Sequence, residues 1–224
     1  LGDVYKRQEQ EKMALESHQK AASAIDQNKF EDEIVSINGV SKDGCIRPET
    51  SLESMSGLKP AFDKDGVVTA ATSSPLTDGA AAVIVCSEDY AKKNNLEILA
   101  FIRGMAISGC SPEVMGIGPV LSSEKALERA GIKLKDIDVI EMNEAFAAQS
   151  LACVKELGVD MSKLNIHGGA ISMGHPLGAS GARITGKAAS LLKETGKRYA
   201  LSTCLLYTSP SPRDQRGSRL AACG

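Results

Sequence analysis

Short apolar segments alternate with helical segments over residues 96–203, and this alternation constrains the fold more than any other feature of the sequence. Two of the amphipathic helical segments end at Gly131 and Gly158, and glycine commonly follows the last turn of a helix. Strands and helices that alternate at such short spacings are typical of a layered α/β domain. We therefore predict an α/β fold, with strands over residues 138–143 and 199–203 and helices over residues 119–131, 145–158 and 182–196.

The first half of the chain has a less regular pattern. Residues 9–28 contain good helix formers with apolar residues along one side, which predicts a helix. Residues 41–64 include two prolines and indicate a loop-rich segment rather than a core element. Apolar runs of strand character predict further strands over residues 33–37, 67–71, 80–87 and 97–108.

The composition excludes several classes of function. The 224 residues carry a formal net charge of only −2 and 4% aromatic residues, which argues against a nucleic-acid partner. No apolar run is long enough to predict a membrane-spanning helix. The six cysteines form no Cys-x-x-Cys pair, so we expect neither a metal site nor a disulfide framework. A cytoplasmic, reducing compartment is the expectation that follows.

The two ends of the chain are related to each other at the level of DNA. A DNA sequence that encodes LGDVYKRQ, residues 1–8, has a reverse complement that encodes CLLYTSP in a shifted frame, and residues 204–211 are CLLYTSPS. This inverted element is similar to the adapter of a transposase-based sequencing library. We therefore expect residues 1–8 and 204–224 to be adapter-derived and exclude them from fold reasoning. The alternative is a genuine N-terminal strand and a Pro/Ser-rich tail.

A glycine-rich segment surrounds His175-Pro176 and is the first candidate for a functional site. Five glycines, at positions 168, 169, 174, 178 and 181, fall within fourteen residues. Glycine lets the backbone approach a ligand closely, so this density indicates a floor beneath a substrate, with a rigidly aimed histidine. The alternative is a tight structural turn with an incidental histidine. The P-loop pattern of nucleotide-binding proteins is absent from the sequence.

The second candidate is the run Asn143-Glu144-Ala145-Phe146, directly after a predicted buried strand. The carboxyl ends of strands in α/β sheets are where ligand-binding groups collect. The structural alternative is that Asn143 caps the following helix and Glu144 lies in its first turn, because both residue types suit those positions. The run by itself leaves both interpretations open.

These motifs resemble those of the thiolase family of acetyl-CoA acyltransferases. The resemblance rests on NEAFAAQ and NIHGGAISMGHPLGASGARI, and RPETSLESMSGLKPAF and VTAATSSPLTDGAAAV are similar to further family segments. It implies the layered α-β-α-β-α thiolase fold, of which this chain holds the C-terminal half. Residues 9–75 would be the remainder of the CoA-binding loop domain, residues 76–96 the last segment of the N-terminal domain, and residues 97–203 a truncated C-terminal domain.

The resemblance also implies roles for residues of the two motifs. His175 matches the general base that activates a nucleophilic cysteine, and its ring also helps to form an oxyanion hole. A cysteine thiol is mostly protonated at neutral pH, so its activation requires such a base. Asn143 matches the asparagine that holds a water molecule donating to the same oxyanion. Phe146 and Met115 would line the acyl pocket.

Coenzyme A is the substrate that the resemblance implies, with no permanently bound cofactor and no metal. Ser74 matches a serine that contacts the pantetheine arm, and Arg47, Ser54, Phe62 and Leu76 lie at CoA-facing loop positions. The family relationship further implies a homodimer or homotetramer.

The implied activity is thiolytic cleavage of 3-oxoacyl-CoA, or the reverse condensation, through an acyl-cysteine intermediate. The family's nucleophilic cysteine would precede this chain, so we expect the polypeptide as written to be inactive. Cys204 is not assigned as the family's second cysteine, because it belongs to the adapter interpretation. One alternative is a thiolase-like acyl-CoA- or lipid-binding protein without catalysis, and the intact Asn143–Phe146 run favours the enzyme over it. A second is an acyl-carrier condensing enzyme, against which the resemblance of the CoA-contact segments argues.

The remaining histidines and cysteines carry no predicted catalytic role. His167 lies where the family accepts Asn or His, which implies a structural or water-binding role. His18 is predicted on the surface of the first helix. Cys86, Cys110 and Cys153 lie on apolar segments and are predicted to be inert core thiols.

Overall fold

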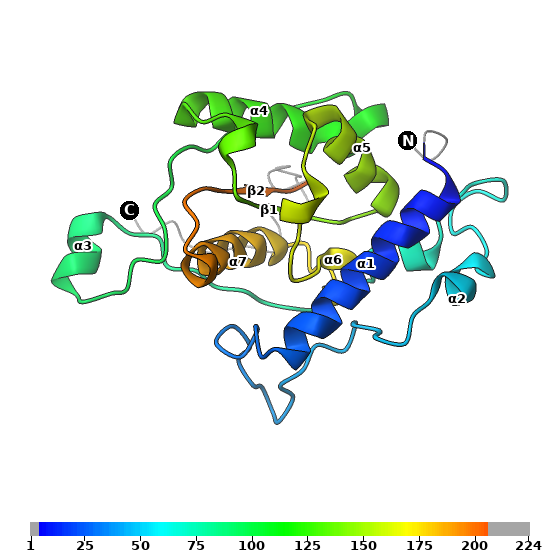
Figure 1. The fold of residues 1–224 in the computed structure, drawn as a ribbon, viewed down its shortest axis with the longest axis horizontal. Coiled ribbons are helices and arrows are strands. Elements are labelled where there is room, and N and C mark those ends of the chain that lie inside the picture. Colours follow the sequence, from blue (N-terminus) through cyan, green and yellow to red (C-terminus); the bar gives the residue numbers. More distant parts are fainter. Residues whose placement is uncertain (1–4, 206–224) are drawn as a thin grey trace, which may run out of the picture.

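A computed structural model describes residues 5–205, and a pair of parallel strands lies at its centre (Figure 1). Strand β1 (Val139–Met142) pairs with β2 (Ala200–Thr203), with Val139 opposite Ala200 and Met142 opposite Thr203. All four residues of β1 are buried. Parallel strands cannot be joined by a hairpin, and here a long helical crossover connects them.

Helices cover the strand pair on both sides. Figure 1 shows α4 (Gly118–Ala130) and α5 (Ala147–Leu157) above the strands and α7 (Ser180–Thr195) below them. The long helix α1 (Arg7–Asp26) packs against α5 and against the short helix α6 (Ala170–Met173). This arrangement confirms the predicted layered α/β class.

The predicted helices and the two central strands are present within a few residues of their expected bounds. Helices α4, α5 and α7 are followed by Gly131, Gly158 and Gly196, which adopt left-handed φ values of 65°, 72° and 63°. The loop-rich segment contains α2 (Leu52–Ser56), and α3 (Glu88–Lys93) follows later. Single 3-10 turns occupy residues 70–72, 112–117, 134–136 and 161–163.

Four of the predicted strands are wrong. Residues 33–37, 67–71, 80–87 and 97–108 form no strand in the described part of the chain; only isolated bridges, Ile37 with Val40 and Pro60 with Thr69, occur among them. A strand requires hydrogen bonds from a neighbouring strand, and a local apolar pattern does not supply that neighbour. The apolar side chains of these segments are consequently exposed, among them Ile84, Val85, Ile102, Met105 and Ile107.

The hydrophobic core joins both halves of the chain around β1. Ile140 and Met142 of β1 pack with Leu164 and Leu201, and Met13 of α1 belongs to the same cluster. The N-terminal helix is therefore an integral part of the domain rather than an appendage.

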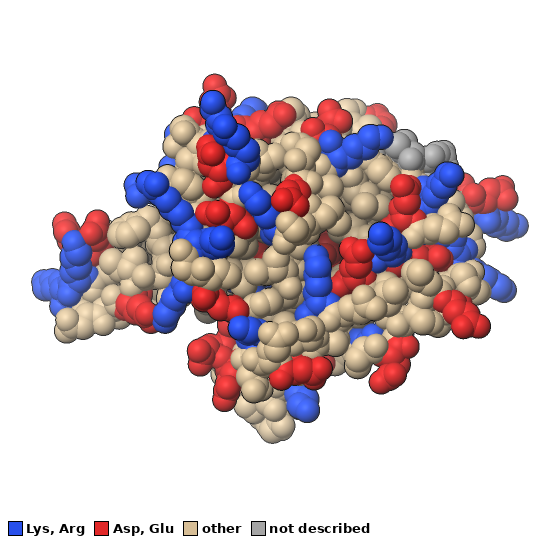
Figure 2. All heavy atoms as spheres, viewed as in Figure 1, with Lys and Arg blue, Asp and Glu red and all other residues tan. Residues whose placement is uncertain are grey.

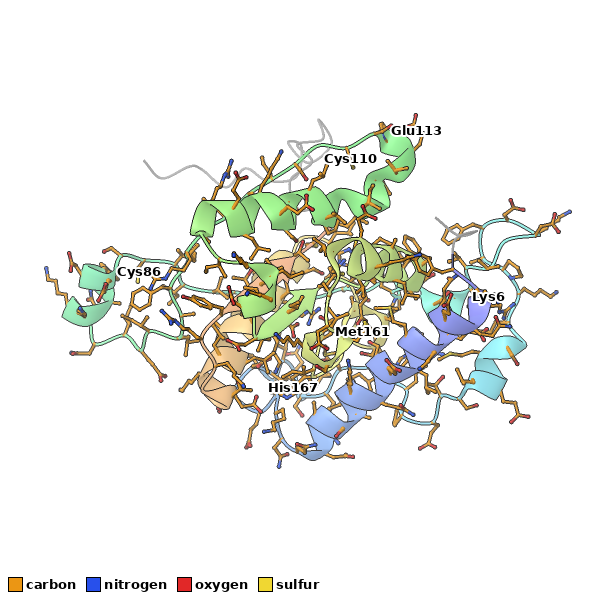
Figure 3. All side chains as sticks on the ribbon, turned by 45° about the horizontal axis from the view of Figure 1, so that its top comes forward. Lys6, Cys86, Cys110, Glu113, Met161 and His167 are labelled. Carbon is orange, nitrogen blue, oxygen red and sulfur yellow. The ribbon has the colours of Figure 1, made fainter. Side chains whose placement is uncertain are left out.

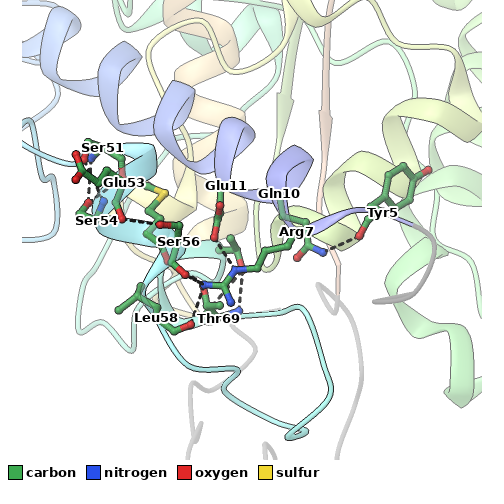
Figure 4. Close-up of polar contacts among 12 residues, drawn as sticks. Tyr5, Arg7, Gln10, Glu11, Ser51, Glu53, Ser54, Ser56, Leu58 and Thr69 are labelled. Atoms are coloured by element: carbon green, nitrogen blue, oxygen red, sulfur yellow. Dashed lines mark hydrogen bonds and ion pairs between the residues drawn. The ribbon is translucent and has the colours of Figure 1, made fainter.

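The first turn of α1 is tied to α2 by Arg7 (Figure 4). Its guanidinium donates to the backbone carbonyls of Met55, Ser56 and Leu58 at 2.9, 3.0 and 2.7 Å and pairs with Glu11 at 2.6 Å. The last carbonyls of a helix lack partners within it, and Arg7 supplies donors for those of α2. Residues 5–8 therefore belong to the described fold, whereas residues 1–4 and 206–224 of the predicted adapter segments lie outside the described residues.

Positive and negative side chains are mixed on the face of the molecule that Figure 2 shows. In Figure 2, lysine and arginine are interspersed with aspartate and glutamate over the whole face in view, with no extended patch of one sign. No helix among residues 5–205 is long and apolar enough to cross a membrane.

Candidate active site

The turn after β1 places Asn143 inside the domain. Asn143 has no exposed surface, and its backbone N–H donates to the carbonyl of Thr203 at 3.0 Å, which continues the ladder between the strands. Helix α5 begins only at Ala147, with Phe146 as its N-cap residue. The structural alternative is therefore wrong, because Asn143 does not cap the helix and Glu144 does not lie in its first turn.

Asn143 and His175 meet across the interior of the domain. The distance between Asn143 Nδ2 and His175 Nε2 is 3.3 Å, although the residues lie 32 positions apart. The Oδ1 atom of Asn143 is buried and has no hydrogen-bond partner within residues 5–205. The two residues singled out by the two motifs thus form one site.

The other ring nitrogen of His175 is held by Ser180. Nδ1 lies 2.6 Å from Ser180 Oγ, and this hydroxyl donates to the carbonyl of Pro176 at 3.1 Å. Because the hydroxyl proton is used there, we assign the Nδ1–H as the donor to Ser180. Nε2 then carries the lone pair and accepts from the Asn143 amide, which leaves the ring in the tautomer that a general base needs.

The electrostatic surroundings keep His175 neutral. Burial lowers the pKa of its imidazole below the ordinary value, and the positive charge of Arg183 lowers it further. A neutral ring at physiological pH is able to accept a proton at Nε2. The site therefore combines an available base with an adjacent amide donor.

Residues 73–79 run alongside both motifs. Ser74 donates through its backbone N–H and its hydroxyl to the carbonyl of Ala145, at 3.0 and 3.2 Å. Thr77 Oγ1 accepts the backbone N–H of His175 at 3.3 Å, and a side chain at Gly174 would overlap Thr77. The structure thus brings Ser74 to the Asn143 turn and aligns the His175 turn against the same segment.

Two aromatic residues meet beside the turn. Phe62 and Phe146 pack edge to face, with their ring centroids 5.7 Å apart. Phe62 remains 74% exposed, so its outer face is open for contact with a ligand. Both were among the predicted pocket or CoA-facing residues.

The four other predicted binding residues are not joined to Asn143 or His175 by a direct interaction in the described chain. Within the described chain, no hydrogen bond or ring contact joins Arg47, Ser54, Leu76 or Met115 to Asn143 or His175. Ser54 forms hydrogen bonds with Ser51 at the start of α2, Leu76 is fully exposed, and Met115 is half exposed. Their proposed roles depend on a ligand rather than on contacts within the chain.

The prediction that His18 lies on the helix surface is wrong. Only 6% of His18 is exposed, because the loop around Arg47 covers it and the Arg47 backbone N–H donates to its Nδ1 at 3.1 Å. Burial, with a smaller contribution from the charge of Arg47, lowers the pKa of this imidazole. His18 consequently anchors the segment in which Arg47 lies.

Lowering the pH should weaken the fold through its histidines. The pKa values of His18, His167 and His175 are all lowered in the folded chain, so as pH falls the unfolded chain binds these protons first. The part of the free energy of unfolding that depends on these histidines should be fully present above about pH 6.5 and be lost as the pH falls below it, whereas buried Glu141, whose pKa is raised to about 8, has the opposite dependence. The glutamine of His18→Gln cannot titrate. We therefore expect the change in urea midpoint from about pH 7.5 to pH 5 to be less unfavourable in this variant than in the unsubstituted chain. A urea midpoint whose pH dependence is the same in both proteins would contradict the lowered pKa of His18.

Of the three cysteines predicted to be core thiols, one is buried and two are accessible. Cys153 is fully buried and donates to the carbonyl of Gly116, and burial raises its pKa to about 11, which confirms an inert core thiol. Cys86 is exposed beside α3, and Cys110 is half-buried, so the prediction is wrong for these two (Figure 3). Both lie next to the extended segments whose strands do not form.

His167 lies away from the site, on the side of α1 and α7 (Figure 3). Its ring packs edge-on against Phe30 with centroids 6.1 Å apart, and its Nε2 lies 3.7 Å from Glu194. It also borders a hollow of about 380 Å³ that contains neither Asn143 nor His175. A structural role for His167 stays a prediction. Within residues 5–205, no group of three His, Cys, Asp or Glu side chains could hold a metal ion.

Sequence reasoning missed Ser180 and Thr77, and it named Glu144 only as a member of the Asn143–Phe146 run, without a role of its own. Ser180 and Thr77 hold the two sides of His175, and Glu144 is 2% exposed at the centre of a hydrogen-bond network. The spacing of five residues between His175 and Ser180 at the start of a predicted helix was the only signal for the first of them.

Comparison with known proteins identifies the class. The family model for the C-terminal domain of thiolase matches residues 96–208, and the model for the N-terminal domain matches residues 4–89. The chain belongs to the thiolase family. It is 47% identical over 210 residues to the 3-ketoacyl-CoA thiolase of Vibrio parahaemolyticus and 50% identical to that of Shewanella loihica. Both matches cover 88% of this chain and 54% of the relative, so the chain spans about half the length of these relatives.

Solved structures agree with this assignment. The crystal structure of human mitochondrial 3-ketoacyl-CoA thiolase is 43% identical and superimposes with a TM-score of 0.85, over 91% of this chain and 53% of the human one. A second structure of the human enzyme, in complex with CoA, matches equally well and covers 91% of this chain and 52% of that one. The Bacillus anthracis acetyl-CoA acetyltransferase is 40% identical, with a TM-score of 0.85 over 91% of this chain and 54% of its own. The fold is the thiolase fold, as the sequence motifs implied.

Proposed function

We propose that this chain supplies the general base and an oxyanion-binding group of a thiolase subunit. The subunit would cleave 3-oxoacyl-CoA with CoA to acetyl-CoA and a shortened acyl-CoA, or catalyse the reverse condensation. The observation that carries the proposal is the 3.3 Å contact between Asn143 Nδ2 and His175 Nε2, with Nδ1 fixed by Ser180. The nucleophilic cysteine is proposed to come from the part of the thiolase length that this chain does not span.

The geometry supports a two-step acyl transfer. His175 Nε2 takes the proton of the cysteine thiol, and the resulting thiolate attacks the keto carbon of the substrate. The carbon–carbon bond breaks, its electron pair passes to the leaving enolate, and the family's second cysteine is proposed to protonate that enolate to acetyl-CoA, which leaves the shortened acyl group on the nucleophilic cysteine. The thiol of free CoA then attacks the acyl-cysteine. Its proton restores the second cysteine, the new acyl-CoA leaves, and the nucleophilic cysteine recovers its proton from His175. Asn143 acts on the oxyanion, through the water molecule that its amide is proposed to hold.

Coenzyme A is the proposed substrate, and no permanently bound cofactor is needed. One of the matched human structures is a complex with CoA. In this chain the half-buried Ser74 and the exposed Phe62 lie next to the Asn143 turn and are the best-supported CoA contacts. We extend the same role to Arg47, Ser54 and Leu76, and an acyl-pocket role to Met115 and Phe146. A homodimer or homotetramer in the cytoplasm completes the proposal.

A chimaera tests the proposed function directly. Residues 5–205 would replace the corresponding half of the Vibrio parahaemolyticus 3-ketoacyl-CoA thiolase, and thiolysis of 3-oxoacyl-CoA would be measured. Turnover that disappears in the His175→Ala chimaera supports the enzyme. A folded chimaera that binds acyl-CoA without turnover would contradict it and favour a binding protein.

Ser180 offers a test of the tautomer assignment. Ser180→Ala removes the acceptor of the Nδ1–H, so part of the His175 population should adopt the other tautomer, in which Nε2 is already protonated. We expect turnover of the chimaera to fall about 10-fold, less than the full contribution of a general base, because part of the population keeps the active tautomer. Nitrogen-15 shifts of the His175 ring should show the mixture of tautomers. Unchanged shifts and turnover would show that Ser180 does not orient the ring.

A further inference from the structure

The carboxylate of Glu144 joins three segments of the chain at one buried point. It accepts hydrogen bonds from Ser17 Oγ of α1 at 2.7 Å, from Asn165 Nδ2 at 2.7 Å and from the backbone N–H of Ile171 in α6 at 3.2 Å. Glu144 is 2% exposed, and no lysine or arginine within residues 5–205 lies at ion-pair distance from it. Both carboxylate oxygens are therefore held by neutral donors that point inward.

The surrounding backbone is shaped to admit this carboxylate. A side chain at Gly169 would overlap the Glu144 carboxyl group. Gly168, at a φ of +85°, faces α1, where an added Cβ would lie 2.7 Å from Ala21 Cβ and 2.8 Å from the Ser17 carbonyl. This glycine pair thus permits the close approach of α1 and Glu144, which differs from the predicted substrate floor.

The network is closed and nearly dry. Ser17 Oγ also accepts the backbone N–H of Gly169 at 3.1 Å, and Asn165 bonds both the N–H and the carbonyl of Met142, at 2.8 and 2.9 Å. The hollow beside Ser17, Glu144 and Asn165 measures about 10 Å³, room for at most one water molecule. Loss of one acceptor would leave buried donors without a partner that water could replace.

Both catalytic candidates are connected to this point through short stretches of backbone. Asn143 directly precedes Glu144, and Ile171 of α6 lies four residues before His175, separated from it by the last two residues of α6 and Gly174. The hydrogen bonds of the Glu144 side chain go to Ser17, Asn165 and Ile171 and to neither Asn143 nor His175. Any effect of Glu144 on the site therefore acts through the placement of these two residues.

We propose that Glu144 is a positioning residue, whose buried carboxylate holds the turn after β1, α6 and α1 together so that Asn143 and His175 face each other. This inference rests on the proposed function where turnover is concerned. The separation of Asn143 and His175 is a property of the chain alone and is tested independently of it.

Glu144→Gln is the discriminating change, because it keeps the size of the side chain and replaces one acceptor oxygen by a donor group. We expect kcat of the chimaera to fall about 30- to 100-fold with KM for CoA nearly unchanged, as small misplacements of reacting groups cost rates of that order. Glu141→Gln is the matched control. Glu141 is 1% exposed on β1, the strand that precedes the Glu144 turn, and burial raises its pKa to about 8, so the change removes little charge at neutral pH. Turnover of the control should stay within about 2-fold, as for residues outside the reacting geometry.

A second measurement does not depend on activity. In the 224-residue chain, Glu144→Gln should shift the nitrogen-15 signals of the His175 ring and the Asn143 side-chain amide, and Glu141→Gln should leave the amide signal in place. If Glu144→Gln does not fold, Ser17→Ala removes one donor to the same carboxylate and should lower kcat about 5-fold, a fraction of the effect of full misplacement. Unshifted signals, or a loss of stability without a loss of kcat, would overturn the proposal. An inactive unsubstituted chimaera with shifted signals would instead refute the proposed function alone.

Discussion

Replacing His175 by alanine should lower turnover of the chimaeric subunit by about three to four orders of magnitude, the upper part of the range for a general base. Alanine removes Nε2, which lies 3.3 Å from the Asn143 amide nitrogen, and with it the proposed acceptor for the thiol proton. The fold should survive, because the backbone N–H of residue 175 still bonds Thr77. Stopped-time thiolysis assays at saturating CoA provide the measurement.

His167→Ala is the control for that experiment. His167 is a second half-buried histidine with a lowered pKa, but it packs against Phe30 and Glu194, near the end of α7 opposite to Ser180, which contacts His175. We expect it to lower stability and to leave kcat within about 3-fold, as expected for a residue outside the reacting geometry. Equal losses in the two variants would mean that the His175 effect is structural. Binding of CoA to the His175 variant, measured by calorimetry, should remain.

Asn143→Ala should lower kcat by about two to three orders of magnitude, the size observed when one oxyanion donor is removed. The side chain is fully buried, so its amide is held without the need to reorganise during the reaction. Because the effect arises in the transition state, kcat and kcat/KM should fall together.

Asn143→Asp sharpens this test. An aspartate of the same shape replaces the donor by a charge that repels the oxyanion, so turnover should be no higher than in the alanine variant. A change confined to KM in either variant would show that Asn143 serves substrate binding instead. Thermal unfolding of both proteins separates such effects from loss of structure.

The elements that could be predicted from the sequence are those with complete local signals. Helices α4, α5 and α7 each have an apolar side and a terminal glycine, and β1 is a short buried run between them. The segments 80–87 and 97–108 show strand-like composition, but pairing is a non-local property, and their strands do not form among the described residues. His18 was misplaced for a related reason, since the loop at Arg47 widens the buried face of α1 beyond its apolar side.

The candidate site could also be predicted only in part from the sequence. Asn143 and His175 were found through motifs, and the structure brings them to 3.3 Å. Their supports could not be found that way, because Thr77, Ser17 and Asn165 are common polar residues whose importance depends on the path of the backbone. For Glu144 the sequence leaves open a place in a first helical turn, and the structure excludes it because the helix begins three residues later.

The helix α1 contact has a consequence for how the domain assembles. Ser17 lies 127 positions before Glu144 and 155 before Ser172, to which its hydroxyl also bonds. Contacts between such distant parts of a chain require closure of long loops, which slows folding relative to local helix formation. During refolding, the helical circular dichroism signal should therefore recover before the hydrogen-exchange protection of Ile171. The site formed by Asn143 and His175 should be the last part of the domain to reach its final geometry.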